Sequence, residues 1–407
     1  MSCREYDCII IGAGPAGLFC AAHLSSTRVL ILEKMPLPGR KLLLSGSGQC
    51  NITHVGDVKN FINHYGVHGP FLRPALMAYP NTSLLKYFED RGVSFLVNDS
   101  GNVFPESLSA NDILDVLLDS CHQAETEILC DTPAENVSVD RGIYVVRTPK
   151  NIYCAKHLVL ATGGMSYPQT GSTGDGLTFA KNLGHSIEKP RPALTPVYIQ
   201  DHRLTALSGI SIPGVRVSIW RNGRQKFVCC GDLLITRFGY SGPVILNASR
   251  WMRDGDLLKI AFSSLNSEEL DVLIRNFSSS FGDKRVQNLL NFLGCPNRVI
   301  KQMVRESGIS EWTTGSQLTS IQRSRLVQNL TAYPGIIDHV GDFRIAMSTA
   351  GGVVLGEINK KTCESKFRPR LFFIGEVLDI DGDTGGYNLQ ACFSTAYIAS
   401  QRILKSF

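Results

Sequence analysis

The sequence predicts an α/β protein in which one sheet-and-helix domain is interrupted by an insertion. Three observations support this prediction. Residues 7–33 show the order strand, glycine-rich turn, helix and strand, which is typical of a parallel sheet. Strands at 158–161 and 371–374 also run directly into glycines. After the prolines of segment 190–196, short alternating runs and then helical spacing replace this pattern, which indicates a domain boundary.

The composition is that of a globular protein. A chain of 407 residues is long enough for two or three domains. With 43% hydrophobic residues, 19% charged residues and a mean hydropathy of +0.01, it can bury a sizeable core, which excludes disordered and fibrous proteins. The longest uncharged stretch, residues 8–27, contains glycines and follows two acidic residues. We therefore expect neither a membrane span nor an export signal, and a cytoplasmic location.

The pattern of the twelve cysteines is also typical of a cytoplasmic protein. None forms a C-x-x-C pair, and most lie inside apolar runs. Such cysteines are typical of small buried side chains in a cytoplasmic protein, so we expect no metal site. Cys229 and Cys230 are adjacent; they are interpreted as two residues on opposite faces of a strand, with a redox pair as the alternative.

The first element is the βαβ unit at residues 8–33. Three isoleucines at 9–11 form a short β-branched run, which favours a strand. Pro15 suits the first turn of a helix that extends to about Ser25. Residues 29–32 are entirely apolar, as expected for a parallel strand covered on both faces, and this strand ends at Glu33.

The turn of this unit carries the pattern G-x-G-x-x-G. Gly12 permits a tight turn, Gly14 lets the backbone approach a pyrophosphate, and Gly17 lets helix and strand pack closely. The helix N-terminus offers unpaired N–H groups to the phosphates. Glu33 follows the first glycine by 21 positions; it can bind the ribose hydroxyls and would repel a 2′-phosphate, which argues against NADP. The pattern predicts a Rossmann-like dinucleotide site; the alternative is a glycine-tight turn with a surface glutamate.

The remaining elements follow in order along the chain. A glycine-rich loop, residues 38–51, comes first. Helical spacing and capping residues predict helices at 81–89 and from 109 onward. Strands are predicted at 143–148 and 158–161, a hairpin-rich β region at about 197–262, helices at 267–330, β structure again from about 341, a buried strand at 371–374 and a final helix after the glycines at 385–386.

Three features favour FAD over NAD as the dinucleotide. The strand at 158–161 runs into Gly163 and Gly164, as in glutathione-reductase-like flavoproteins. The strand at 371–374 places Glu376 at its end, where a carboxylate can bind a ribityl hydroxyl. The helix led by the glycines at 385–386 can direct its N-terminus at the pyrimidine edge of the flavin. Each feature alone also fits an ordinary α/β turn.

Seven stretches of the chain resemble one family of flavoproteins, the YhiN/BaiN-like family, also called the aminoacetone oxidase family of NAD(P)/FAD-dependent oxidoreductases. They occur in order over nearly the whole chain. The stretches are GRKLLLSGSGQCN (39–51), VFP (103–105), ATGGMSYPQTGSTGDG (161–176), LSGIS (207–211), GDLLITRFGYSGP (231–243), AGGV (350–353) and GEVLDIDGDTGGYNLQ (375–390).

The resemblance implies a Rossmann-like FAD domain interrupted by a β-barrel and a small helical insert. The predicted limits are 1–192 and 337–407 for the FAD-binding domain, 193–266 for the barrel and 267–336 for the helical insert. Motif and resemblance together assign FAD contacts, while no catalytic residue is assigned. The FAD contacts are Gly12, Gly14, Pro15, Ala16, Gly17, Glu33, Lys34, Arg40, Lys41, Ser45, Gly46, Gly48, Ala134, Thr162, Gly163, Gly375, Glu376, Gly386, Asn388 and Leu389.

The chain departs from the family pattern in three places. Gln49 and Asn102 stand where the family has arginine, and Ala391, Cys392 and Phe393 stand where it has tryptophans. FAD binding relies mostly on backbone groups and should survive these changes. These departures instead put in question the contacts that the family resemblance implies to a substrate or redox partner near the flavin.

The predicted function is that of an FAD-dependent oxidoreductase acting on a small organic substrate, by amine oxidation or by reduction of an enone. One alternative is a nucleic-acid-directed flavoprotein, because residues 201–330 carry 17 Lys and Arg against 10 Asp and Glu. The linear sequence lacks the interleaved aromatic and basic residues of an RNA platform, so nucleic acid is not the favoured partner. Another alternative is a non-catalytic FAD-binding redox sensor. Cys50 is interpreted as a packing residue, with a redox-active thiol as the alternative.

The electron donor is the last expectation. We find no second G-x-G-x-x-G unit, so we expect no dedicated nicotinamide domain. Electrons should come from the substrate or from NAD(P)H bound transiently against the flavin.

Overall fold

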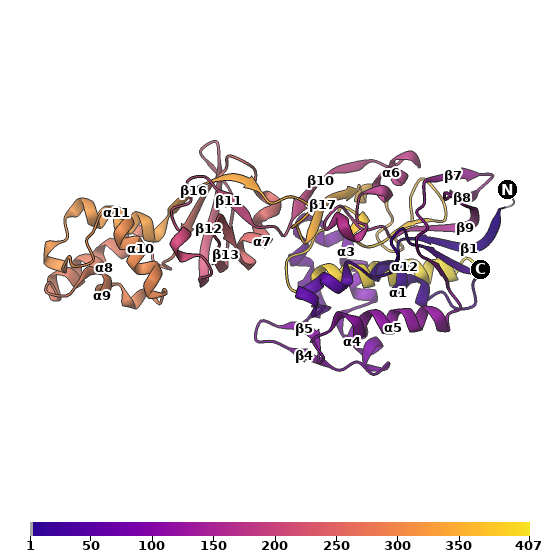
Figure 1. The fold of residues 1–407 in the computed structure, drawn as a ribbon, viewed down its shortest axis with the longest axis horizontal. Coiled ribbons are helices and arrows are strands. Elements are labelled where there is room, and N and C mark those ends of the chain that lie inside the picture. Colours follow the sequence, from indigo (N-terminus) through magenta and orange to yellow (C-terminus); the bar gives the residue numbers. More distant parts are fainter. Residues whose placement is uncertain (1–2) are drawn as a thin grey trace. The chain divides into compact units, whose positions relative to one another are not determined.

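The computed structural model describes residues 3–407, which form two compact units (Figure 1). Unit 1 comprises Met1–Ala193 together with Phe343–Phe407, and unit 2 comprises Leu194–Asp342. Unit 1 is built on a mixed sheet covered by helices, and unit 2 is a barrel that carries a group of helices. The predicted fold class, α/β with a β-barrel and a helical insert, is confirmed.

The sheet of unit 1 has the strand order β6-β2-β1-β9-β8-β7, and β18 also pairs with β9. Strands β1, β2, β6, β9 and β18 run parallel, while β7 and β8 form an antiparallel edge. The strands are β1 (Arg4–Ile11), β2 (Val29–Leu32), β6 (Glu127–Leu129), β7 (Asn136–Asp140), β8 (Ile143–Arg147), β9 (Ile152–Leu160) and β18 (Leu371–Phe373).

The register of this sheet brings three strand ends together. Ile11 at the end of β1 pairs with Leu160 of β9, which in turn pairs with Phe373 of β18. Because parallel strands end at one edge of a sheet, the glycine-containing segments that follow these strands meet there. This edge is where ligands bind in open α/β sheets.

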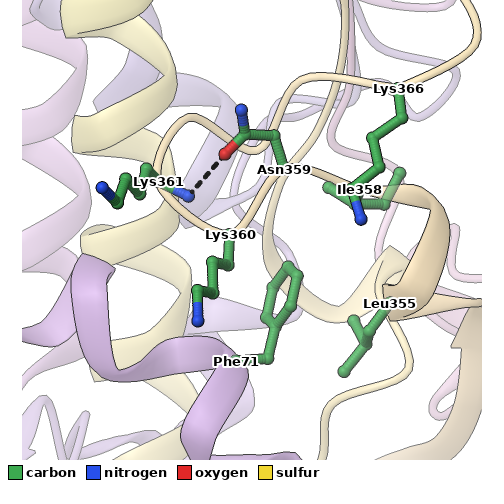
Figure 2. A pocket seen from close by; sticks show the side chains of 7 residues that line it. All are labelled: Phe71, Leu355, Ile358, Asn359, Lys360, Lys361 and Lys366. Atoms are coloured by element: carbon green, nitrogen blue, oxygen red, sulfur yellow. Dashed lines mark hydrogen bonds between the residues drawn. The ribbon is translucent and has the colours of Figure 1, made fainter.

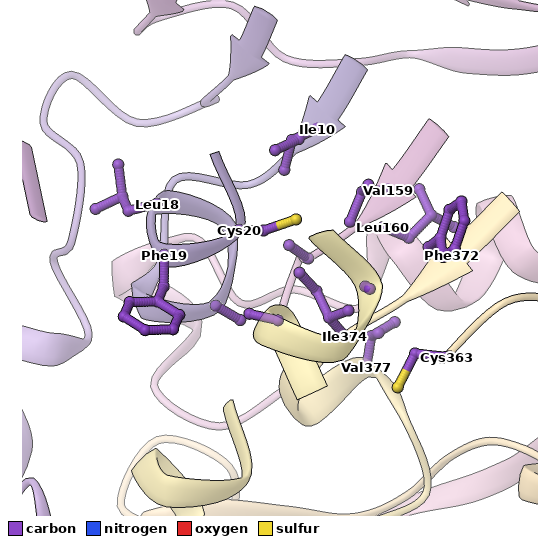
Figure 3. Close-up of a cluster of buried hydrophobic side chains, with 14 of the residues drawn as sticks. Ile10, Leu18, Phe19, Cys20, Val159, Leu160, Cys363, Phe372, Ile374 and Val377 are labelled. Atoms are coloured by element: carbon purple, nitrogen blue, oxygen red, sulfur yellow. The ribbon is translucent and has the colours of Figure 1, made fainter. Parts of the chain in front are cut away.

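The core of unit 1 forms because the strands are apolar on both faces. Ile10 of β1, Val159 of β9 and Phe372 of β18 are buried, and Figure 3 shows them among side chains of α1 (Pro15–Ala22). Helix α1 packs on α12 (Tyr387–Leu404) and α5 (Ala110–Gln123). Phe19 of α1 makes an edge-on contact with Phe393 of α12, with ring centroids 5.0 Å apart. Aromatic packing therefore fixes the helix that follows the glycine turn.

The other elements of unit 1 surround this layer. Helix α3 packs on α12, and β10 pairs with β17 in an antiparallel ribbon. These elements are β3 (Thr53–His54), α2 (Val58–Phe61), α3 (Gly69–Ala78), α4 (Asn81–Glu89), β4 (Phe95–Val97), β5 (Asn102–Pro105), α6 (Asp175–Asn182), β10 (Ile187–Ala193) and β17 (Ser348–Val353).

Unit 2 contains a closed barrel with the strand order β11-β14-β13-β12-β15-β16. Its helices share a second core with the barrel, in which Leu270, Ile300 and Leu326 are buried. The strands are β11 (Val197–Ile199), β12 (Ser211–Arg221), β13 (Arg224–Ile235), β14 (Gly239–Ser241), β15 (Leu257–Ala261) and β16 (Tyr333–Val340). The helices are α7 (Pro243–Ala248), α8 (Ser267–Ser280), α9 (Val286–Leu289), α10 (Asn297–Glu306) and α11 (Ser320–Thr331).

The cysteines are mostly unpaired. Cys8, Cys20, Cys121 and Cys363 are buried free thiols, as the sequence predicts, whereas Cys3 forms a disulfide with Cys154 that the sequence analysis did not anticipate. Within residues 3–407, no group of three His, Cys, Asp or Glu side chains is arranged to hold a metal ion. No helix of this part of the chain is long and apolar enough to cross a membrane.

The predicted limits of the three parts remain predictions, and limited proteolysis tests them. We expect a protease to cut first near residues 190–196 or 335–342, because few contacts hold a linker between separately packed units. Mass spectrometry of the early fragments locates the cuts. Equal resistance of these two segments and the FAD-binding domain would contradict the prediction.

Candidate functional site

The glycines of the β1–α1 turn are required for two different reasons. A methyl group on Gly12 would lie 2.5 Å from the carbonyl oxygen of Ala161, and one on Gly17 would fall on the carbonyl oxygen of Gly12. Packing alone therefore requires glycine at these two positions. A methyl group on Gly14 would have no atom of residues 3–407 within 4 Å. The fold does not require glycine there, but a pyrophosphate lying against the backbone does.

The start of α1 is suited to an anion. The helix begins at Pro15 after Gly14, and no side chain of the described residues caps it. The N–H groups of Ala16 and Gly17 are therefore free to bind phosphate oxygens. Gly39 donates its N–H to the carbonyl of Ala13 at 2.8 Å, which brings the half-buried Arg40 to the same turn. Arg40 thus supplies positive charge near the predicted pyrophosphate position.

Glu33 is fixed at the end of β2. Its two carboxylate oxygens accept hydrogen bonds from the backbone N–H of Ala13 at 2.8 Å and of Met35 at 2.9 Å. Its carbonyl accepts from the N–H of Thr132 at 2.9 Å, so the segment with Ala134 runs beside it. This is the arrangement that the predicted ribose contact of Glu33 requires, and it brings Ala134 to the same end of the site.

Replacing Glu33 tests this assignment. We expect Glu33→Ala to weaken FAD binding by about 10- to 100-fold, because the variant loses the hydrogen bonds that the ribose hydroxyls donate to a charged acceptor. FAD titration of the apoprotein, followed by flavin fluorescence, measures the change. Glu33→Gln retains one acceptor and should lose less. An unchanged dissociation constant in a variant with an unchanged melting temperature would contradict the assignment.

A polar cluster lies at the ends of β9 and β18. Lys41 Nζ is 2.6 Å from Glu376 Oε2, and both side chains are mostly buried. The other oxygen of Glu376 accepts from the N–H of Thr349 at 2.8 Å and from the Ser166 hydroxyl at 3.1 Å. A methyl group on Gly163 would lie 3.9 Å from Glu376 Oε2. The structure thus brings together Lys41, Gly163 and Glu376, which the sequence analysis named from three distant segments.

Gly375 joins this cluster to the glycine turn. Its φ of +69° is in the left-handed region, where glycine is favoured, and a methyl group there would lie 3.0 Å from the Cβ of Ala16. Its N–H donates to Thr395 Oγ1 at 3.0 Å, so it is tied to α12 as well. The end of β18, the start of α1 and α12 therefore meet at this residue.

The loop at 42–51 turns sharply through several left-handed residues. Gly46, Ser47, Gly48 and Cys50 all have φ between +56° and +91°. The Ser45 hydroxyl donates to the carbonyl of Leu42 at 2.6 Å and so stabilises the turn. Cys50 is fully buried, and burial raises the pKa of its thiol to about 12. The thiol is therefore protonated at neutral pH, which favours a packing role over a redox role.

The N-terminus of α12 has a defined geometry. Gly386 has a φ of +87°, and a methyl group there would lie 2.5 Å from the carbonyl of Thr53. With its amide oriented to suit its neighbours, Asn51 accepts a hydrogen bond from the Gly386 N–H at 3.2 Å. The Asn388 side chain binds the N–H and the carbonyl of Gly382 at 2.8 and 3.0 Å. Asn388 therefore offers a ligand its backbone, as does the neighbouring Leu389.

Two predicted residues have protein partners of their own. Lys34 forms an ion pair with Asp175 at 2.5 Å and also binds Thr173. Thr162 packs against Gly176 at the start of α6, where a larger side chain would collide with its hydroxyl. Both residues hold the 171–176 loop beside the glycine turn, and no direct FAD contact is needed to explain them.

The sequence analysis missed a histidine–tyrosine stack beside the α12 N-terminus. Tyr387 lies between the rings of His64 and His54, with centroids 3.9 and 5.3 Å away. His64 Nδ1 is 3.1 Å from Asp383 Oδ2. Single histidines in unrelated segments gave no signal in the sequence. Ser166 and Thr349 were missed as partners of Glu376, although each lies in or next to a stretch that carries the family resemblance.

The three departures from the family pattern lie in different surroundings. Gln49 is exposed, whereas Phe393 is buried in the α1–α12 contact. Asn102 Oδ1 would lie 3.1 Å from a methyl group on Gly385, next to Tyr387. Of the three, Asn102 is the one that lies beside the stack, since it pairs with His54 between β5 and β3.

A cavity of about 420 Å³ lies elsewhere in unit 1. Figure 2 shows Phe71 of α3 and Leu355 at one side of it and three lysines, Lys360, Lys361 and Lys366, around it. None of the predicted FAD contacts lines this cavity. We therefore place the cofactor site at the glycine turn and not in this cavity.

Comparison with known proteins identifies the family. The model of the HI0933-like protein Rossmann domain matches residues 6–402. The chain belongs to the HI0933-like family. The family resemblance in the sequence is thereby confirmed, and so are the Rossmann fold and FAD as the cofactor. This HI0933-like protein is an FAD-dependent oxidoreductase, which excludes the non-catalytic sensor.

Several curated relatives match over their whole length. The HI0933-like chain is 29% identical over 407 residues to the ribosomal RNA dihydrouridine synthase of Escherichia coli, covering 98% of each chain. It is 30% identical over 404 residues to the protein of the same name from Haemophilus influenzae, covering 97% of this chain and 98% of the other. It is 26% identical over 403 residues to the 3-dehydro-bile acid delta(4,6)-reductase of Clostridium scindens, covering 96% and 97%.

Solved structures share the fold of this HI0933-like protein. The 3-ketosteroid-delta4-(5alpha)-dehydrogenase of Rhodococcus jostii has a TM-score of 0.51 at 15% identity, with 98% of this chain and 97% of that chain covered. A flavocytochrome c3 fumarate reductase has a TM-score of 0.52 at 16% identity, with 99% and 78% covered. At these identities, the likeness establishes the fold alone.

Proposed function

We propose that this protein reduces a carbon–carbon double bond conjugated to a carbonyl, and that its substrate is a uridine of ribosomal RNA. The observation that carries the proposal is the full-length match to two ribosomal RNA dihydrouridine synthases. The third relative is named for a reaction of the same type, since its substrate is a 3-keto steroid with double bonds at positions 4 and 6. In uracil, the C5=C6 bond is likewise conjugated to the C4 carbonyl. The same flavin chemistry would therefore account for both of the named reactions.

The reaction adds two electrons and two protons to the substrate. FAD held at the glycine turn would, once reduced, supply the hydride for the carbon remote from the carbonyl, and a proton must reach the carbon next to it. The first turn of α12 offers N–H groups and a partial positive charge that stabilise negative charge beside it. The Tyr387 stack forms a polar aromatic wall at the same place, against which a flat pyrimidine ring can lie.

The charge of the chain supports an RNA substrate over a small neutral one. Residues 201–330, inside unit 2, carry 17 Lys and Arg against 10 Asp and Glu. The remainder of the chain has a small negative balance. Positive charge supplies a large part of the affinity of proteins for nucleic acid, whereas the binding of a free steroid does not depend on a basic surface. Together with the matches to the two ribosomal RNA dihydrouridine synthases, this charge favours RNA over the small substrate that the sequence alone suggests.

A steroid-like enone is the second candidate, because the Clostridium scindens relative also matches over 96% of this chain. Both substrates are offered in one experiment. Purified protein whose FAD has been reduced with dithionite in the absence of oxygen is incubated with transcribed, unmodified ribosomal RNA or with a 3-keto-4,6-diene steroid. Nucleosides from the digested RNA and the steroid are then analysed by mass spectrometry.

Each outcome is decisive. We expect dihydrouridine at one site of the RNA and no change in the steroid. Reduction of the steroid alone would replace the proposal with the second candidate. Reduction of neither substrate by protein that retains its FAD would refute both.

The entry of electrons gives a separate prediction. Because the sequence has no second dinucleotide-binding turn, we expect NADH and NADPH to reduce the flavin slowly and without saturation. Stopped-flow absorbance of the oxidised flavin under anaerobic conditions measures the rate against nucleotide concentration. Fast, saturable reduction with micromolar affinity would show that a dedicated nicotinamide site exists.

A further inference from the structure

Helix α10 of unit 2 separates its apolar and cationic residues. Val299, Ile300, Met303 and Val304 face the core of the unit and are buried. Arg298, Lys301 and Arg305 are exposed and spaced three and four residues apart, so they lie on one face of the helix. We call these three residues the α10 stripe.

The α10 stripe is not neutralised by the protein. Within residues 3–407, none of its three cations has a carboxylate at ion-pair distance, although Arg298 donates to the carbonyl of Ala206 at 2.8 Å. Four other cations of unit 2 are paired. Arg203 binds Glu306 at 3.2 Å, Arg221 binds Asp256 at 2.7 Å, and both Arg275 and Arg323 bind Asp271. The α10 stripe therefore brings three cations without a carboxylate partner onto one face of a single helix.

A further cation lies near the C-terminal end of the stripe. A methyl group on Gly308 would lie 3.9 Å from the Arg325 guanidinium of α11. Gln322 of α11 donates to the carbonyl of Gly308 at 2.8 Å, which holds the two helices together at this turn. Positive charge thus continues from Arg305 to the loop that joins α10 to α11.

This loop carries an exposed tryptophan. The side chain of Trp312 is 63% exposed, whereas Trp251 stacks on Phe227 with centroids 3.9 Å apart. The guanidinium of Arg285 lies 4.1 Å from the Trp312 ring centroid. The loop is anchored, because the N–H of Val286 donates to the carbonyl of Thr313 at 3.0 Å. An exposed aromatic ring beside an arginine on an anchored loop offers a face on which an unpaired base can stack.

We propose that the α10 stripe and Trp312 bind a single-stranded segment of RNA. Cations along a helix fit the spacing of a phosphate backbone, and an exposed tryptophan with an adjacent arginine provides a stacking surface for an unpaired base. The inference rests on the proposed function, because it takes RNA to be the substrate.

Folding creates this surface from distant parts of the chain. Arg285 and Trp312 are 27 residues apart, and α11 adds Arg325 from a third segment. The interleaving of basic and aromatic residues that the linear sequence lacks is therefore present in three dimensions. It is contained within unit 2.

The test uses full-length, FAD-loaded protein and a fluorescein-labelled oligouridylate of twelve nucleotides. Binding is followed by anisotropy at several salt concentrations. The variants are the double variant Lys301→Gln/Arg305→Gln and Trp312→Ala. The control is the double variant Lys150→Gln/Lys181→Gln, which removes two exposed lysines of unit 1.

We expect the stripe variant to reduce the slope of log K against log salt by about 1.4, which is the loss of two phosphate contacts on a single strand. Trp312→Ala should weaken binding by about 5- to 150-fold, as the loss of one stacked base does. It should also abolish the quenching of tryptophan fluorescence by the RNA. The control should leave both quantities unchanged, and far-UV circular dichroism together with the melting temperature shows that all variants are folded.

Three results would overturn the inference. The first is that the stripe variant binds RNA as tightly as the unaltered protein. The second is that the control variant weakens binding as much as the stripe variant does. The third is that the unaltered protein binds anionic phospholipid vesicles but not RNA. Failure of the proposed function is separable from these results. Protein that binds RNA through the stripe but forms no dihydrouridine would refute the function and leave the surface in place. If the stripe variant bound RNA with unchanged affinity and formed dihydrouridine at an unchanged rate, the surface would be refuted and the function would stand.

Discussion

Gly14→Val is expected to give a folded protein that does not retain FAD. The added side chain would enter space that no atom of residues 3–407 occupies within 4 Å of the new Cβ, and the φ of −80° suits any residue. The valine therefore meets the pyrophosphate and not the protein. We expect FAD affinity to fall by about 100-fold or more, in line with the cost of overpacking a close contact. Absorbance of the purified protein and titration of the apoprotein with FAD measure the loss.

Two other glycines serve as controls. Gly356 also has open space around its Cβ position, with the nearest atom 4.0 Å away, and it lies far along the chain from the turn. Gly356→Val should keep both the fold and the FAD. Gly12→Val should lose the fold as well as the FAD, because its side chain would strike the carbonyl of Ala161. A Gly14→Val protein that is yellow and binds FAD with unaltered affinity would disprove the predicted contact between Gly14 and the pyrophosphate.

Lys41→Met is expected to lower the stability of the protein while leaving it folded. Lys41 neutralises Glu376 at 2.6 Å, and their side chains are 25% and 15% exposed. Removing one partner leaves a mostly buried carboxylate without its counter-charge, which is costly. Because both groups retain some contact with water, we expect the free energy of unfolding to fall by about 1–3 kcal/mol. Denaturant unfolding of the apoprotein measures this change without interference from FAD.

A surface pair on α4 provides the comparison. Lys86 and Asp90 are 3.1 Å apart, with side chains 72% and 56% exposed. Lys86→Met should change the free energy of unfolding by less than about 0.5 kcal/mol. The double variant Lys41→Met/Glu376→Gln should recover part of the loss, since it leaves no uncompensated charge. Equal effects of Lys41→Met and Lys86→Met would mean that the Lys41 pair has no special role.

Local patterns in the sequence were enough to predict the phosphate end of the site. Gly12, Gly14, Gly17 and Glu33 all lie within one βαβ unit, where spacing alone determines geometry. The strand ends at 160 and 373 were predictable for the same reason, because an apolar strand followed by glycine is a short-range signal.

The flavin end of the site could be predicted only in part. Glu376 follows a recognisable strand, but its partner Lys41 lies 335 residues away, and no spacing rule connects them. The stack of His54, His64 and Tyr387 depends on where β3, the segment that follows α2 and the start of α12 meet, which is a matter of tertiary packing. The same is true of Arg285 over Trp312. A pattern along one segment cannot report contacts that form when segments meet.

The strand order of unit 1 also determines when during synthesis the cofactor can bind. Glu376 and the start of α12 belong to the last part of the chain, yet they complete a site whose first residues are Gly12 and Gly14. Unit 2 is contiguous and is entirely translated before Phe343. A growing polypeptide can therefore fold unit 2 on the ribosome, whereas the predicted FAD contacts at residues 375–389 become available only after unit 2 has been completed. A premature stop codon between unit 2 and residue 375 would leave a colourless product.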